Sequence, residues 1–207
     1  MSKNVHIDKE SFLKELEFFC KQAIENTNSG TREGSELELN KRIDKILETS
    51  GLVCKINFDH INNAGQQDIV FVRKDVLGKN YVNGEKPTSK QGIYIRFYYF
   101  YETKSFYLEF GYPKVECDAF DKMNRDECFG TEVADRKFRK SYSDFESCKD
   151  KIMADFLEFV AYYKGFEAND FIVRNRQVEI EMNAKANNQT DAITAAIVSD
   201  TMSIKSE

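Results

Sequence analysis

The sequence predicts an α+β fold, with N-terminal helices and a long C-terminal helix packed on a mostly antiparallel sheet that contains a central aromatic hairpin. Two stretches with apolar residues at helical spacings of three and four come first in the chain. Two aromatic and β-branched runs, 92–101 and 106–113, are separated by four polar residues, which is typical of a β-hairpin. A further amphipathic helix is expected at 144–164, so helices and strands are segregated along the chain.

Two helices are predicted in the N-terminal part. The first spans 8 to about 25, and the polar, glycine-containing stretch 26–34 is predicted to be a loop. The second spans about 35–49. It begins with Ser35 and Glu38, which have the spacing of a capping box, in which each side chain satisfies an amide at the start of the helix.

The middle of the chain contains the predicted strands. Apolar residues alternate over 52–58, and a strand rich in β-branched residues follows at 68–73. The stretch 62–67 between them should be a loop. The segment 74–91, with two glycines and a proline, is expected to be an excursion from the sheet. The charged segment 114–142 has no pattern that assigns it.

The C-terminal part begins with the long helix, for which Ser143 and Glu146 form a second predicted capping box. After that helix the composition becomes polar and small. We therefore expect one α+β domain over 1–173 and a polar tail or linker over 174–207, with at most a short helix in it.

Composition excludes several classes of protein. The chain has no apolar run near the length of a membrane span, and its first residues lack the apolar centre of a signal peptide. Its five cysteines are odd in number and widely spread, which favours reduced thiols in a cytoplasmic protein. The two histidines, His6 and His60, are far from any cysteine cluster, so we expect no metal site and no cofactor.

Motifs of common enzymes are missing, so we expect no catalytic activity. The chain has no P-loop and no GxSxG sequence, and no serine or cysteine has an evident histidine partner. One enzymatic alternative is a metal-dependent nuclease of the PD-(D/E)xK type. In that alternative Asp68 and Glu102 would hold Mg²⁺, and Lys104 would lie near the attacking water.

The first strand of the hairpin carries the strongest functional signal. Alternation places Tyr94, Arg96, Tyr98 and Phe100 on one face, with aromatic rings around a single arginine. Flat rings can stack on a nucleobase, and an arginine can bind phosphate or a base edge. Two alternatives remain, because these rings could also pack beneath the long helix or form an interface with another protein.

A net charge of −5 argues against binding nucleic acid by bulk charge, so any DNA contact requires a local basic surface. The candidate is the run of four cations around Phe138, with Arg136, Lys137, Arg139 and Lys140 as predicted contacts to the DNA backbone. The alternative is a solvated loop before a helix.

The hairpin also carries a resemblance to a known family. The Gly92-Ile93-Tyr94 start, the short polar turn and the apolar strand ending at Gly111 resemble the central hairpin of the N-terminal DNA-recognition domain of McrB-type modification-dependent restriction proteins. The Asn/Gly loop 62–66 and the strand that follows it are similar to the Gly/Asn-rich loop and the following strand of that family. The helix 143–164, with its terminal Tyr-Lys pair, resembles the closing helix of the family.

The resemblance implies a DNA-binding specificity module of an antiviral restriction system, which binds duplex DNA with a modified cytosine and flips that base into a pocket. The pocket would lie between the loop and the sheet, formed by Asn62, Asn63, Gly65, Gln66, Tyr94, Arg96 and Tyr98. An NTPase motor and a nuclease, separate or fused C-terminally, would be its partners. The chain departs from the family where Ile69-Val70 replace a Pro-Trp pair, and it has no tryptophan.

Overall fold

Strands that are neighbours in the sheet are also neighbours along the chain, so the sheet is an antiparallel meander in the order β1-β2-β3-β4-β5. The computed structural model describes residues 7–29, 36–58, 66–80, 92–112, 117–129 and 136–172. The strands are β1 (Leu52–Asn57), β2 (Gln66–Arg73), β3 (Tyr94–Phe100), β4 (Ser105–Gly111) and β5 (Arg139–Tyr142). The predicted α+β class with a central aromatic hairpin is therefore confirmed.

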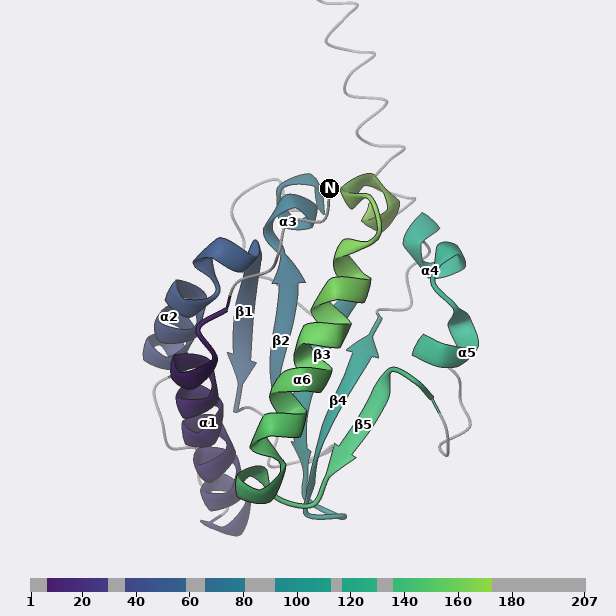
Figure 1. Ribbon diagram of the computed structural model, residues 1–207. Coiled ribbons are helices and arrows are strands. Elements are labelled where there is room, and N and C mark those ends of the chain that lie inside the picture. The colour runs from purple at the N-terminus through teal and green to yellow at the C-terminus, as the bar shows by residue number, and fades with distance from the viewer. Residues whose placement is uncertain are drawn as a thin grey trace, which may run out of the picture.

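The long helices lie together on one face of this sheet (Figure 1). They are α1 (Lys9–Ser29), α2 (Glu36–Ile46) and α6 (Phe145–Lys164). Shorter helices lie near the ends and side of the sheet: α3 (Lys74–Asn80), α4 (Asp118–Lys122), α5 (Arg125–Cys128) and the 3₁₀ turns η1 (Glu48–Ser50) and η2 (Ala168–Phe171). None of the described helices is long and apolar enough to cross a membrane.

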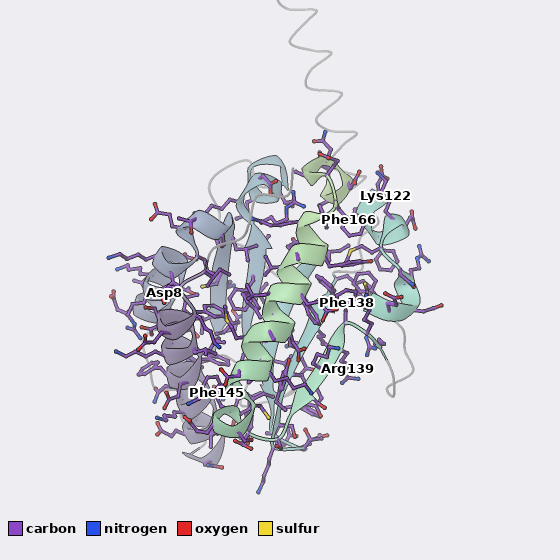
Figure 2. All side chains as sticks on the ribbon, viewed as in Figure 1. Asp8, Lys122, Phe138, Arg139, Phe145 and Phe166 are labelled. Atoms are coloured by element: carbon purple, nitrogen blue, oxygen red, sulfur yellow. The ribbon has the colours of Figure 1, made fainter. Side chains whose placement is uncertain are left out.

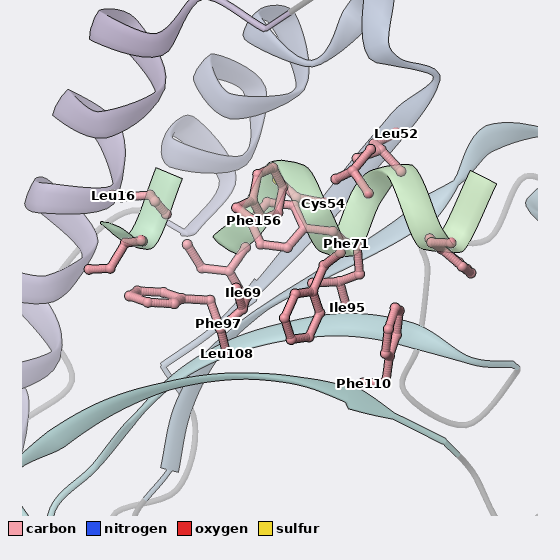
Figure 3. Packing of buried hydrophobic residues seen from close by; sticks show 14 of the residues in the cluster. Leu16, Leu52, Cys54, Ile69, Phe71, Ile95, Phe97, Leu108, Phe110 and Phe156 are labelled. Atoms are coloured by element: carbon pink, nitrogen blue, oxygen red, sulfur yellow. The ribbon is translucent and has the colours of Figure 1, made fainter. Parts of the chain in front are cut away.

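The main core lies between the helices and the odd-numbered positions of β3. Phe156 of α6 stacks on Phe12 of α1 and meets Phe71 of β2 edge-on, each at 4.8 Å between ring centres. Figure 3 shows Phe156 above Phe71, Ile69 and Ile95. Since these side chains are almost fully buried, the helix stripes and the alternation of the strands meet in one apolar layer.

Two predicted boundaries near β2 are wrong. The first helix continues to Ser29, although 26–29 was predicted to be loop, and β2 begins at Gln66 rather than at Asp68. The polar side chains are tolerated because they bond across this junction. Asn26 donates to Gln67 at 3.4 Å, and Gln67 donates to the carbonyl of Ala23 at 3.2 Å.

The predicted start of the long helix is also shifted. Its N-cap is Asp144, not Ser143, because the Asp144 carboxylate accepts the amide of Ser147 at 2.8 Å. Within the helix, Phe159 is buried whereas Leu157 is exposed. Segment 114–142, which had no assignment, supplies β5. Ser35 of the other predicted capping box and the predicted tail 174–207 lie outside the described residues.

The outer edge of β1 is bonded to side chains of α2. These contacts pair Asp44 with the amide of Cys54 at 2.7 Å, Asn40 with that of Ile56 at 2.9 Å and Glu36 with that of Phe58 at 2.8 Å. The spacing fits, because eight helical residues rise about 12 Å and four strand residues about 13 Å. Helix and strand therefore run antiparallel and in register.

The last residue of β2, Arg73, fastens the sheet to the end of α6. Its buried guanidinium donates to the carbonyls of Tyr163 at 2.9 Å and Phe166 at 2.7 Å, and it forms a two-point contact with Asp75. A cation at this end of the helix binds carbonyls that have no partner within the helix.

Candidate functional site on the outer face of the sheet

The outer face is the face of the sheet opposite α1, α2 and α6, formed by the even-numbered positions of β3 and their neighbours. Strand register builds it in rows across the sheet. One row is Asn57, Asp68, Tyr98, Tyr107 and Ser141, and the next is Lys55, Val70, Arg96, Glu109 and Arg139. An aromatic row thus lies directly beside a charged row.

Four of these side chains form a continuous stack across β3, β4 and β5, which we call the Arg-Tyr stack. The guanidinium carbon of Arg96 lies 4.5 Å from the ring centre of Tyr98. Tyr98 stacks on Tyr107 at 5.2 Å with an interplanar angle of 16°, and the guanidinium carbon of Arg139 lies 5.2 Å from the Tyr107 ring centre. Cation–π attraction and ring stacking therefore link the two rings of the aromatic row to the two arginines of the charged row.

Both arginines of the Arg-Tyr stack are paired with carboxylates. Arg96 Nε lies 2.7 Å from Asp68 Oδ2, and the second oxygen of Asp68 accepts the amide of Asn57 at 2.6 Å. Arg139 Nε lies 3.3 Å from Glu109 Oε2, within ion-pair distance but not aligned as a hydrogen bond. The hydrogen bond to Asp68 therefore fixes the guanidinium plane of Arg96, and the charges of both arginines are balanced locally.

Burial raises the pKa of the Tyr98 hydroxyl, and the nearby charge of Glu109 raises it further. Burial likewise raises the pKa of Tyr94. Both phenols therefore keep their protons at neutral pH and can donate hydrogen bonds.

Gly111 lets Tyr94 lie flat on the neighbouring strand. The two residues face each other across β3 and β4, and a Cβ atom at position 111 would lie 2.1 Å from the Tyr94 ring. Tyr94 also packs with Val70 and Val72 of β2 and with Leu77 of α3. This small apolar cluster closes one end of the outer face.

The structure brings together some of the predicted base-binding residues, while others lie outside the described residues. Tyr94, Arg96 and Tyr98 come together on the outer face, but Tyr98 is only 4% exposed because its ring contacts Arg96 and Tyr107. Gln66, which was predicted to lie in the loop, is the first residue of β2. Asn62, Asn63 and Gly65 lie outside the described residues.

The predicted basic run is divided between different sides of the chain. Phe138 is buried in the core, Arg139 faces Glu109 on the outer face, and Lys140 is opposite Leu108. Figure 2 shows Phe138 and Arg139 together at the start of β5. Lys137 is exposed and lies 4.0 Å from Glu127. Arg136 has a buried Nε without a hydrogen-bond partner among the described residues.

The nuclease alternative gains no support from this geometry. Both oxygens of Asp68 are bonded to Arg96 and Asn57, so a metal ion would have to displace a guanidinium. Glu102 and Lys104 lie in the exposed turn of the hairpin. Within the described parts of the chain, no three potential metal ligands are grouped together.

Sequence reasoning missed Tyr107, Glu109 and Asn57 as partners in this site. The signal was present, because a four-residue turn between Phe100 and Ser105 places Tyr107 opposite Tyr98 and Glu109 opposite Arg96. Counting outward from the turn therefore identifies both partners in β4.

Comparison with known proteins gives no relative. No protein-family model matches the chain, and neither the curated proteins nor the solved structures contain one with significant similarity. The chemistry of the outer face is therefore the basis for assigning a function.

Proposed function

We propose that this chain is a DNA-binding specificity module and that the outer face of its sheet is the contact surface. The Arg-Tyr stack carries the proposal, since it combines two planar cations with two rings on one face. Guanidinium groups bind phosphate and base edges, and rings stack on bases. A sheet with this composition is a known solution for holding unstacked bases.

Tyr107 is the ring on which we expect a base to stack, and Arg139, which lies over this ring, has to move aside for the base. Tyr107 is half-buried, whereas Tyr98 beneath the same stack is almost covered. A base in a duplex must be extruded before it can reach a ring on a sheet, so the proposal includes base flipping. Arg96 and Arg139, at the two ends of the Arg-Tyr stack, would exchange their carboxylate partners Asp68 and Glu109 for a phosphate or a base edge.

The resemblance to the McrB-type recognition domain supports a modified cytosine as the target. It also supports a cytoplasmic role in antiviral restriction, in which a motor NTPase and a nuclease act on the DNA that this module has bound. The hairpin that carries the resemblance is the hairpin that carries the Arg-Tyr stack, β3 and β4.

The test measures binding of short duplexes that contain cytosine, 5-methylcytosine or 5-hydroxymethylcytosine. Fluorescence anisotropy at about 50 mM salt is the readout, since phosphate contacts are strong at low salt. Tyr107→Ala should weaken binding by about 1–3 kcal/mol, the usual contribution of a base–aromatic stack. 2-Aminopurine beside the modified base should brighten on binding if the base is flipped.

The matched control is Tyr101→Ala, because Tyr101 is an exposed tyrosine in the turn of the same hairpin. It should bind DNA as the parent chain does. Lys137→Ala should weaken binding to all duplexes and flatten the salt dependence. Failure of the parent chain to bind any duplex under these conditions would remove the proposal.

A further inference from the structure

A pocket of about 350 Å³ opens between the second half of α1, the β3–β4 hairpin and the start of α6. From α1 it is lined by Glu17, Cys20, Lys21 and Ile24, which share one helix face because they are three or four residues apart. Figure 2 shows Phe145, another lining residue, in the first turn of α6.

The wall of this pocket is apolar. Cys20, Tyr99, Phe106 and Phe145 are all less than 9% exposed, and Ile24 at the mouth is 37% exposed. An apolar wall of this kind forms few hydrogen bonds with water, so an apolar ligand can replace the water at little cost. The volume of the pocket is within the range of small-molecule sites. Tyr99 and Phe106 belong to the helix-covered face of the sheet, so the pocket is separate from the outer face.

Charged groups surround the mouth, and the acids among them are already engaged. Glu17 pairs with Lys21, Asp144 accepts the amide of Ser147, and Glu146 pairs with Lys149 at 3.4 Å. Lys104 differs, because within the part of the chain that the structure describes it forms no ion pair. Its backbone has a φ of 49°, the left-handed conformation that completes the hairpin turn.

We infer that this pocket binds a small apolar molecule that carries one carboxylate. The apolar part lies against Tyr99, Phe106 and Cys20, and the carboxylate meets the ammonium group of Lys104 at the mouth. Lys104 is the cation at the mouth with no carboxylate partner among the described residues, so its ammonium group is the one that a carboxylate of the ligand can pair with.

The experiment compares decanoate, decanol and decylamine as probes of the full chain by isothermal titration calorimetry. Decanoate should bind at about millimolar concentration or below, and it should bind more tightly than the other two. Lys104→Gln should weaken decanoate binding about two- to fivefold, as expected for an exposed ion pair, and leave decanol binding unchanged. The control Lys41→Gln removes a lysine on α2 and should change neither.

Two further measurements locate the ligand. In the parent chain with labelled isoleucine methyl groups, decanoate should shift the NMR signal of Ile24 but not that of Ile46 on α2. Ile24→Trp should fill the mouth and abolish binding, and its circular dichroism spectrum should match that of the parent chain, since Ile24 is partly exposed. Absence of decanoate binding, or binding that leaves the Ile24 signal unmoved, would overturn the inference. If Lys104→Gln weakened the binding of decanoate and of decanol by the same factor, the assignment of a carboxylate to the ligand would be overturned.

Discussion

The two faces of the same sheet are buried to nearly the same extent but are held by different forces. Phe97 on the helix-covered face is 1% exposed and Tyr98 on the outer face is 4% exposed. Phe97 contacts other rings, stacking on Phe106 at 5.8 Å. Tyr98 contacts a guanidinium that is itself paired with Asp68. Low exposure alone therefore does not show how a side chain is held in place, whereas the chemistry of its partners does.

This difference predicts which substitutions reduce stability and which change binding. Apolar side chains on the helix-covered face stabilise the fold through packing, and their loss leaves a cavity. Paired charges on the outer face mainly offset the cost of their own desolvation, so they add little net stability and can exchange partners.

The largest effect is expected on the helix-covered face. Phe71→Ala should lower the free energy of unfolding by about 3–5 kcal/mol, because Phe71 is fully buried between Phe12 and Phe156. Urea denaturation followed by circular dichroism measures it. The control is Phe100→Ala on the outer face, expected to cost less than about 2 kcal/mol. Equal losses for the two variants would contradict the distinction between the faces.

Arg73 is a buried charged residue on the helix-covered face, and the next largest effect is expected there. Arg73→Met should cost about 2–3 kcal/mol, because two buried carbonyls at the end of α6 lose their donor. The same denaturation measures it, with Lys74→Met as control, since Lys74 is exposed and next in sequence. A loss no larger than that of the control would show that water replaces the guanidinium.

Arg73 also gives this face a dependence on pH. Its hydrogen bond to Asp75 lowers the pKa of that carboxyl below the usual 3.8. A lowered folded-state pKa means that the stabilisation is complete above about pH 4 and is lost as the pH falls through the folded value. The parent chain should therefore lose this contribution in acid, and Arg73→Met should lack that part of the loss.

The sequence identified the helices, the hairpin and the sheet because these depend on periodicity and turn residues within one segment. It missed what depends on contacts between segments. The extension of α1 rests on the bond between Asn26 and Gln67, which are 41 residues apart. Strand β5 is only four residues long, and its alternation is hidden in a charged run in which Phe138 faces the core.

For the candidate site, alternation correctly placed Tyr94, Arg96 and Tyr98 on one face. It could not show that Asp68 pairs with Arg96 or that Asn57 donates to the second oxygen of Asp68, because these contacts depend on the register of β1, β2 and β3, which lie far apart in the sequence. It also could not show that Arg139 and Lys140 lie on opposite sides of the sheet, because the start of β5 at Arg139 is not evident in the charged run.

The smallest effect is expected for the ion pair of the outer face. A double-mutant cycle with Asp68→Asn and Arg96→Gln should give a coupling energy of about 1–2 kcal/mol, since the side chains are only 10% and 20% exposed. Denaturation of the four chains measures it, and the same chains can be tested for DNA binding. A coupling energy near zero would mean that the pair does not fix the guanidinium plane that we propose for contact with DNA.

The ladder of side chains from α2 onto β1 decides how this sheet can meet other chains. An exposed edge strand offers free amides with which a second chain can pair, and this is a route to aggregation. At β1 the amides of Cys54, Ile56 and Phe58 already have acceptors in α2. Polymerisation of the folded protein by strand addition at β1 would therefore require α2 to leave first, so α2 shields this edge of the sheet as well as covering its core.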